Sequence, residues 1–123
     1  MRGTYFRAWD TYNEAWADEY LAITEDGHVI EIKDDGTTEY WKDRFIIEFD
    51  TGLKDKNGKK ICGGDIVQCG AYKGKVHYSV GVACYCVGDY TPIYQISRIE
   101  NESFITLKVI GNIHENPELL KEK

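Results

Sequence analysis

The chain has 123 residues, of which 42% are hydrophobic and 13% aromatic, and its formal net charge is −6. A chain of this length fits one domain, or two tightly packed subdomains, and buries a usable core without obligatory disulfides or metal. The composition excludes a disordered chain, and no apolar run has the length of a membrane span or an export leader, so we expect a folded cytoplasmic protein.

The charge divides unevenly along the chain. Residues 1–50 carry thirteen Asp and Glu against five Lys and Arg, whereas residues 51–123 carry eight against ten. We therefore predict an acidic N-terminal β subdomain over 1–50 and a second subdomain over 51–123. The alternative, in which residues 1–50 add strands to one continuous sheet, stays open.

The first half reads as a series of short strands. Residues 4–10 alternate bulky and polar side chains and predict a strand, and residues 16–23 favour a strand over a short helical turn. Asp-Gly pairs at 26–27 and 35–36 are turn dipeptides between β-compatible runs, which predicts a three-stranded meander with Ile30 and Ile32 facing the core. The apolar run at 45–49 predicts a buried strand, with Lys42 and Arg44 at its solvated start.

Residues 51–68 contain the densest group of turn signals. The dipeptide Asn57-Gly58 predicts a hairpin with a type I′ turn, in which both central residues have positive φ. A second bend is expected at 63–65, where the Asp65 carboxylate can accept backbone N–H groups of its own turn. Strands are expected from 66–69, 75–78 and 82–87, with 70–74 ending the first of them, and their close spacing suggests a small barrel.

The C-terminal part predicts two more strands and a helical turn. Residues 93–99 are β-compatible, and residues 104–113 read as a closing strand in which Gly111 marks a bulge or bend. After it, Asn116 can cap a helical turn and Pro117 fits the first helical position.

No catalytic or metal-binding set stands out. The four cysteines, at positions 62, 69, 84 and 86, have C-x6-C and C-x-C spacings and not the paired C-x2-C pattern of structural zinc sites, so we expect thiols and no metal or cofactor. A nucleophilic cysteine needs a nearby base, and only His77 with Cys84 or Cys86 across a hairpin offers that pairing. We do not expect an enzyme, and this pair is kept as a distant alternative.

Four separated stretches resemble one family. They are FRAWD at 6–10, TGLKDKNGKKI at 51–61, GDIV at 64–67 and IGNIHENPELL at 110–120, and they occur in the order found in the YopX family of small bacteriophage and prophage proteins. Two places differ from the family pattern: Phe49-Asp50 precedes the Thr-Gly-Leu instead of Gln-Tyr, and Cys62-Gly63 precedes Gly-Asp instead of an aromatic-acidic pair.

The resemblance implies a mainly β fold with a C-terminal SH3-like barrel, a phage or prophage origin and a location in the cytoplasm of a bacterial host. It implies no biochemical activity. The residue types of the motif favour a structural role. Its glycines suit backbone conformations that other residues rarely adopt, and Trp9, Leu53 and Ile113 are expected in the core. The motif residues are Phe6, Arg7, Trp9, Asp10, Thr51, Gly52, Leu53, Asp55, Asn57, Gly58, Gly64, Asp65, Gly111, Asn112, Asn116 and Pro117.

Two binding hypotheses follow. The first is a non-catalytic binding or assembly module that forms a homo-oligomer or binds a phage or host protein, because exposed strand edges and abundant aromatic residues build interfaces. The second is a nucleic-acid-associated module, with no role for a membrane in either. Its candidate residues are a basic group with two possible stacking tyrosines, namely Lys54, Lys56, Lys59, Lys60, Tyr72, Lys73, Lys75 and Tyr78.

Overall fold

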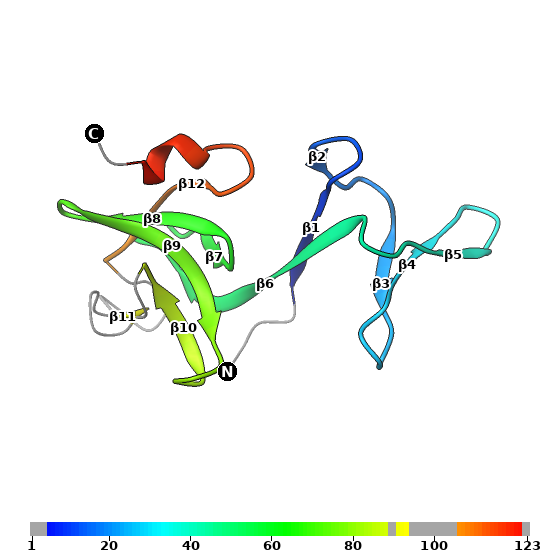
Figure 1. The fold of residues 1–123 in the computed structure, drawn as a ribbon, viewed down its shortest axis with the longest axis horizontal. Helices are drawn as coiled ribbons and strands as arrows, with labels where there is room; N and C mark the ends of the chain where they lie inside the picture. The colour runs from blue at the N-terminus through cyan, green and yellow to red at the C-terminus, as the bar shows by residue number, and fades with distance from the viewer. Residues whose placement is uncertain (1–4, 89–90, 94–105, 122–123) are drawn as a thin grey trace. The chain divides into compact units, whose positions relative to one another are not determined.

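The computed structural model describes residues 5–88, 91–93 and 106–121 (Figure 1). It confirms the mainly β class and the short C-terminal helical turn. Within the described residues the strands and the 3-10 helix η1 are β1 Phe6–Asp10, β2 Ala15–Trp16, β3 Leu21–Ile23, β4 Val29–Ile32, β5 Thr38–Tyr40, β6 Phe45–Lys54, β7 Lys60–Cys62, β8 Asp65–Cys69, β9 Tyr72–Ser79, β10 Cys84–Val87, β11 Thr91–Pro92, β12 Lys108–Asn112 and η1 Pro117–Leu120.

The chain divides into two compact units. One unit, here the core unit, comprises Met1–Phe6 and Glu48–Lys123, and the other, here the acidic unit, comprises Arg7–Ile47. Strands β1 and β6 each contribute residues to both units. The subdomain boundary between residues 50 and 51 stays a prediction.

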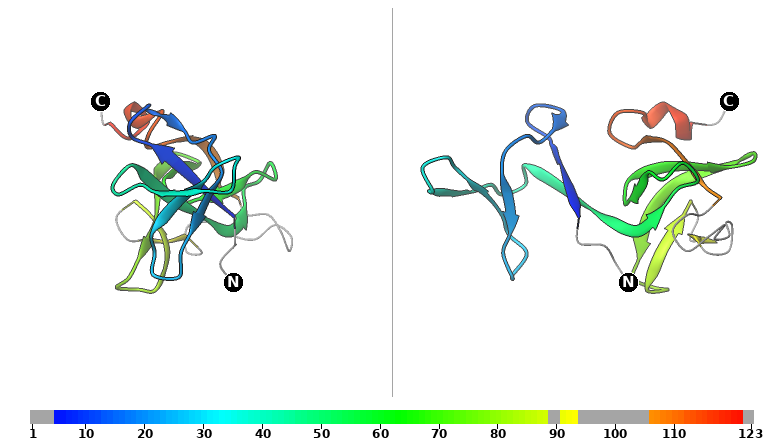
Figure 2. Two further views of the ribbon diagram at one scale, coloured as in Figure 1. Left: turned by 90° about the vertical axis from the view of Figure 1, so that its right-hand side faces the viewer. Right: turned by 180° about the vertical axis from the view of Figure 1, so that it is seen from behind.

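The core unit is built on a five-stranded sheet with the order β11-β10-β9-β8-β12. The long strands β8 and β9 curve together, and β12 runs antiparallel beside β8 (Figures 1 and 2). A buried apolar cluster contains Ile61, Val67, Val76, Val87, Ile93 and Leu107. The sheet therefore curls around one core, while its SH3-like arrangement stays a prediction.

One glycine of this sheet lies where a turn was expected. Gly74 falls inside β9 and not in the segment that ends the preceding strand, because only Gly70 and Ala71 separate β8 from β9. A Cβ atom at Gly74 would lie 3.0 Å from the Gly88 backbone nitrogen. The absent side chain permits this close approach of two backbones.

The end of the chain partly follows the prediction. The β8–β12 register shifts between Val109 and Gly111, which confirms the bulge. Pro117 begins η1 as expected, but the Asn116 side chain does not cap it. Instead Asn116 Oδ1 accepts the Asn112 backbone N–H (3.2 Å). Residues 94–99 and 104–105 of the two predicted strands lie outside the described residues.

The acidic unit contains the predicted meander. Strands β3, β4 and β5 form an antiparallel three-stranded sheet, and Gly27 and Gly36 have the positive φ values, +89° and +85°, that its turns require. All four residues of β4 are half-buried, Ile30 and Ile32 included. The meander therefore has no strongly buried face.

The buried side chains at the middle of strand β6 are polar. Glu48 and Asp50 are buried, whereas Ile46 is 43% exposed. The polar residues are buried because they have hydrogen-bonding partners inside the core unit, described below. The strand predicted at 45–49 is present, but Glu48 is its one buried residue there, and its apolar residues are half-buried or exposed.

No helix among the described residues is long and apolar enough to cross a membrane.

Candidate binding surfaces

The lysine-rich hairpin between β6 and β7 is organised by a buried carboxylate. Asp55 is 1% exposed, and its Oδ1 accepts the backbone N–H groups of Asn57 and Lys59 (both 2.9 Å). Its Oδ2 accepts the Val109 backbone N–H (2.9 Å). One side chain thus shapes the tip of the hairpin and fastens it to β12.

The turn at this tip is not the predicted type I′. Gly58 has φ +84°, but Asn57 is not among the described residues with positive φ, and Gly58 N–H donates to Asp55 O (2.9 Å). Because Asp55 Oδ1 accepts the N–H groups of both Asn57 and Lys59, these two groups point toward the same atom. This arrangement favours a type I turn followed by a left-handed glycine. The hairpin itself was predicted correctly.

Strand β12 lies next to both the lysines of the β6–β7 hairpin and the lysines of the β8–β9 region. Lys56 N–H donates to Leu107 O (2.9 Å), so the hairpin tip adjoins the start of β12. In the sheet register, Gln68 lies opposite Lys108 on one side and opposite Lys73 on the other. Lys108 was missed because its position beside Gln68 depends on strand pairing, and no local sequence signal marks it.

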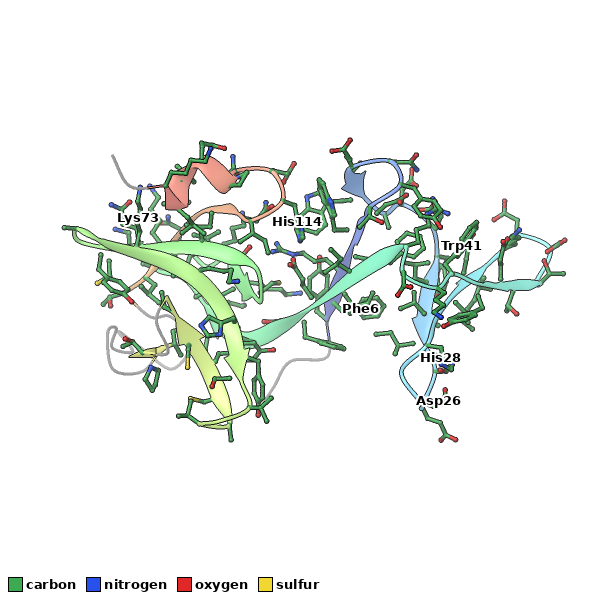
Figure 3. All side chains as sticks on the ribbon, viewed as in Figure 1. Phe6, Asp26, His28, Trp41, Lys73 and His114 are labelled. Carbon is green, nitrogen blue, oxygen red and sulfur yellow. The ribbon has the colours of Figure 1, made fainter. Side chains whose placement is uncertain are left out.

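These residues define a lysine surface. Directly opposed residues of antiparallel strands share a face, and alternate residues along one strand do so as well, which places Lys73, Lys75 and Lys108 on one face of the sheet. Lys73 lies toward the β8–β9 turn in Figure 3. Together with the adjacent hairpin tip, these residues form the lysine surface, which consists of five exposed residues: Lys56, Lys59, Lys73, Lys75 and Lys108.

The two candidate stacking tyrosines are not on this face. Tyr72 and Tyr78 alternate with Lys73 and Lys75 along β9 and share the side of buried Val76. The Tyr72 hydroxyl donates to Val87 O (3.0 Å). The Tyr78 ring contacts the Tyr85 ring edge-on at 5.3 Å.

The remaining candidate lysines form a second pair. Lys54 and Lys60 are opposite one another in the β6–β7 register, and the Lys60 Nζ atom lies 4.2 Å from the centre of the Tyr5 ring. A cation over an aromatic ring is stabilised by the electrons of its face. Lys60 therefore has a partner within its own unit.

Burial of acidic side chains makes the exterior of the core unit more basic than its sequence. Glu48, Asp50, Asp55 and Asp65 are buried, whereas eight lysines are exposed in the part of this unit that the structure describes. The exposed acids in that part are Glu115 and Glu118. At the exposed surface of this part, lysines therefore outnumber acidic side chains by eight to two.

The buried carboxylates support the turns of the family-like motif. Asp65 Oδ2 accepts the Cys62 N–H (2.8 Å), as predicted, and Asp50 Oδ1 accepts the Gly52 N–H (2.8 Å). Thr51 Oγ1 accepts the Leu53 N–H (3.1 Å). These contacts fit the structural interpretation of the motif.

A buried hydrogen bond between side chains joins β6 to the segment after β12. His114 Nε2 lies 2.8 Å from Glu48 Oε2, and both side chains are less than one-tenth exposed. Gly64 has φ +87°, and a Cβ there would overlap the Glu48 carboxylate. Asn112 Oδ1 accepts the His114 and Glu115 N–H groups (3.0 and 2.9 Å), which holds this segment (Figure 3).

The acidic unit is organised by one arginine. Arg44 Nε and Nη2 donate to the two carboxylate oxygens of Asp10 (3.0 and 2.8 Å), and Nη2 also lies 3.2 Å from Glu19. The hydrogen bond from Arg44 lowers the pKa of Asp10 from 3.8 to about 2. Arg44 is 8% exposed. Its predicted place at a solvated strand start was wrong, because a carboxylate distant in sequence pairs with it.

Aromatic rings surround this arginine. Its guanidinium lies 4.5 Å from the Trp41 ring centre, 4.7 Å from Phe45 and 5.1 Å from Tyr12. Nearby, the Trp9 and Trp16 rings meet edge-on at 5.1 Å. The predicted core residues Trp9, Leu53 and Ile113 are half-buried.

The other N-terminal motif residues also make ring contacts. Arg7 lies 4.5 Å above the Trp16 ring, and Phe6 meets Phe49 edge-on at 6.1 Å. The Phe49 that departs from the family pattern therefore packs within the core unit.

The surface of the acidic unit is both apolar and anionic. Ala8 is its one buried apolar residue, and Tyr12, Tyr20, Tyr40 and Ile46 are 63, 74, 51 and 43% exposed. Asp and Glu outnumber Lys and Arg in this unit by eleven to four. Seven of these acids are exposed, namely Glu14, Asp18, Glu25, Asp26, Asp34, Asp35 and Asp43.

Cys86, one of the two cysteines considered with His77, lies in an environment that disfavours its thiolate. Cys86 and His77 are opposite one another in the β9–β10 register. Burial raises the pKa of the Cys86 thiol, which opposes formation of the reactive thiolate. His77 Nε2 lies 2.8 Å from Gly88 O, and a carbonyl oxygen only accepts, so this nitrogen carries a hydrogen. All four cysteines are free.

No group of three or more His, Cys, Asp and Glu side chains suited to a metal ion occurs among residues 5–88, 91–93 and 106–121.

Comparisons with known proteins cover both units. A family model described as YopX protein matches residues 5–121. Among solved structures, the chain is similar to the crystal structure of protein EF1440 from Enterococcus faecalis, with 30% sequence identity, a TM-score of 0.61, and 94% of this chain and 96% of that chain covered. No curated protein matches the sequence.

Proposed function

We propose that this chain, which belongs to the YopX family, is a non-catalytic assembly module that acts as a homo-oligomer. A phage or prophage accessory protein in the cytoplasm of a bacterial host fits this role. The observation that carries the proposal is the surface of the acidic unit, where one alanine is the single buried apolar residue. Such a unit gains little from its own core and much from an interface that covers it.

The exposed residues of this unit are of the kind that interfaces use. Tyr20 and Tyr40 are more than half exposed, and the half-buried aliphatic side chains of β3 and β4 lie in the same three-stranded sheet. Tyrosine is enriched at interfaces because a large apolar ring carries one polar group. A second copy is the partner we propose, because its core unit carries the opposite charge on its exposed side chains.

The test is the mass of the protein in solution. Size-exclusion chromatography with light scattering at micromolar concentration should give a mass above the 14.1 kDa of one chain. The double substitution Tyr20→Ser and Tyr40→Ser should weaken association at least about tenfold, since interface tyrosines often contribute more than about 1 kcal/mol each. A wild-type protein that stays at 14.1 kDa would overturn the proposal.

The chain offers a matched control in the core unit. Val80 and Val82 are 87 and 52% exposed in the turn between β9 and β10. Replacing both with serine also removes exposed apolar surface, but away from the acidic unit. Association should persist in this control. Equal losses in the two double variants would show that the effect is not specific to the acidic unit.

A further inference from the structure

We infer that the lysine surface of one copy receives the acidic unit of a second copy, so that chains join head to tail. The inference rests on the proposed function and specifies which two surfaces meet. It arises from the juxtaposition of Lys73, Gln68 and Lys108 across three strands, with the hairpin tip beside them.

In the described part of the core unit, the lysine surface exposes five cations, whereas the exposed acids there are Glu115 and Glu118. Lys73, Lys75 and Lys108 are exposed on one face, whereas Asp55 and Asp65 of the same unit are buried and accept backbone N–H groups. The hydrogen bonds of these carboxylates go to backbone N–H groups of the turns and of β12. The exposed lysines are therefore accessible to the carboxylates of an incoming molecule, whereas Asp55 and Asp65 are not exposed to pair with them.

The acidic unit has an excess of negative charge, which is complementary to the lysine surface. Two of its four cationic side chains already pair within the unit, Lys33 with Glu39 at 2.7 Å and Arg44 with Asp10 at 2.8 Å. The acidic unit exposes seven acidic side chains and two lysines, Lys33 and Lys42. Opposite charges on separate parts of one chain favour a heterologous contact between copies, which leads to a closed ring or an open filament.

A second copy fits the lysine surface better than a nucleic acid does. Tyr72 and Tyr78 project from the other face of β9, so the lysines have no stacking partner from these two rings. The acidic unit would also repel a phosphate backbone, because its acids outnumber its cations by eleven to four. The same excess attracts it to the lysine surface of another copy.

Charge and apolar contact would have separate roles in this interface. Complementary charge guides encounter and fixes orientation, while burial of apolar side chains supplies most of the affinity. Tyr20 and Tyr40 lie on the same unit as the exposed acids. Raising the salt from about 0.05 M to about 1 M shortens the reach of exposed charges severalfold and should weaken association at least about tenfold.

The decisive experiment uses two charge-reversed variants of the full chain. In the first, Lys73, Lys75 and Lys108 are replaced by glutamate. In the second, Asp18, Glu25 and Asp34, exposed acids of the acidic unit, are replaced by lysine. Each variant alone presents like charges on both surfaces, so each should be monomeric by light scattering. In an equimolar mixture the unchanged lysine surface of the second variant meets the unchanged acidic unit of the first, so the mixture should assemble.

A third variant controls for the change in net charge. Lys42, Lys54 and Lys121 are exposed and lie outside the lysine surface, and their replacement by glutamate alters the net charge as much as the first variant does. This control should associate within about threefold of the wild type, since distant exposed charges are largely screened at moderate salt. Far-ultraviolet circular dichroism should show that all three variants remain folded.

The outcomes separate the inference from the proposed function. Oligomers that persist in both reversed variants would overturn the head-to-tail contact while leaving assembly intact. Mixtures that stay monomeric would also overturn it. A wild type that is monomeric at every salt concentration would overturn the proposed function itself.

A separate experiment measures whether the wild type binds nucleic acid. The wild type is titrated with a 30-base-pair duplex of about 20 kDa at low salt, followed by fluorescence anisotropy. We expect no binding. Salt-sensitive binding by a monomeric wild type, lost in the lysine-to-glutamate variant, would assign the surface to nucleic acid and overturn the inference.

Discussion

The core unit buries six apolar side chains in one cluster, whereas the acidic unit buries one alanine and is organised around the ion pair of Arg44 and Asp10. In the core unit, buried carboxylates such as Asp55 hold turns around an apolar interior. In the acidic unit, a charged network takes the place of that interior. Two units of one small β chain are thus stabilised in different ways.

The largest effect should come from removing the arginine. In Arg44→Leu the Asp10 carboxylate stays buried without its main partner, which typically costs about 3–5 kcal/mol. Trp9, Trp16 and Trp41, the three tryptophans of the chain, all belong to the acidic unit, so urea unfolding followed by tryptophan fluorescence reports on it.

Lys42→Leu is the control for this prediction, because Lys42 is exposed and close in sequence. Its free energy of unfolding should change by no more than about 0.5 kcal/mol. Equal transitions for the arginine variant and the wild type would mean that the ion pair does not stabilise the unit.

The second prediction compares apolar deletions in the two units. Leu107→Ala in the core cluster should lower the free energy of unfolding by about 2–5 kcal/mol, because Leu107 is fully buried. Ile30→Ala in the half-buried β4 should cost about 1 kcal/mol or less, since less apolar area returns to water. Chemical denaturation followed by circular dichroism measures both. A larger loss at Ile30 would remove the distinction between the units.

A pair of glycines sharpens the comparison further. Gly64 and Gly36 have nearly the same φ, +87° and +85°, but only at Gly64 would an added Cβ meet another group, the Glu48 carboxylate. Gly36→Ala should cost about 1 kcal/mol for the left-handed backbone. Gly64→Ala should cost about 1–3 kcal/mol more, because Glu48 must move away from His114. Thermal unfolding of the two variants gives the difference directly, and similar melting temperatures would argue against the buried pair.

The smallest predicted effect is a dependence on pH. The folded-state pKa of Asp10 is lowered from 3.8 to about 2 by its hydrogen bond from Arg44. The stability from this ionised group is therefore complete above about pH 4 and is lost as pH falls through about 2. Acid titration with fluorescence detection should show this loss in the wild type and a smaller one in Asp10→Asn. Identical acid transitions would contradict the assignment.

Local features of the sequence predicted much of the backbone. The Asp-Gly pairs gave the meander because positive φ at Gly27 and Gly36 is a property of the turn itself. The bulge near Gly111 and the turn of Asp65 were predicted for similar reasons. In each case the interactions that decide the conformation span a few residues.

Features that depend on distant partners escaped prediction. Arg44 is buried because Asp10, separated from it by 34 positions, accepts two of its N–H groups. Glu48 is buried because it meets His114, 66 positions away. Lys108 joins the lysine surface only when β12 pairs with β8. Charge and alternation along the chain do not specify such partners.

The four cysteines all belong to the core unit, where Cys62 and Cys86 are buried and Cys69 and Cys84 are half-buried. A thiol-specific reagent reaches a buried sulfur only when the surrounding structure opens, so the rate of modification reports the free energy of that opening. The cysteine thiols thus act as native chemical probes of local opening in the core unit, which contains no tryptophan. Mass spectrometry of partly labelled protein would rank the opening of β7 against that of β10 without a single substitution.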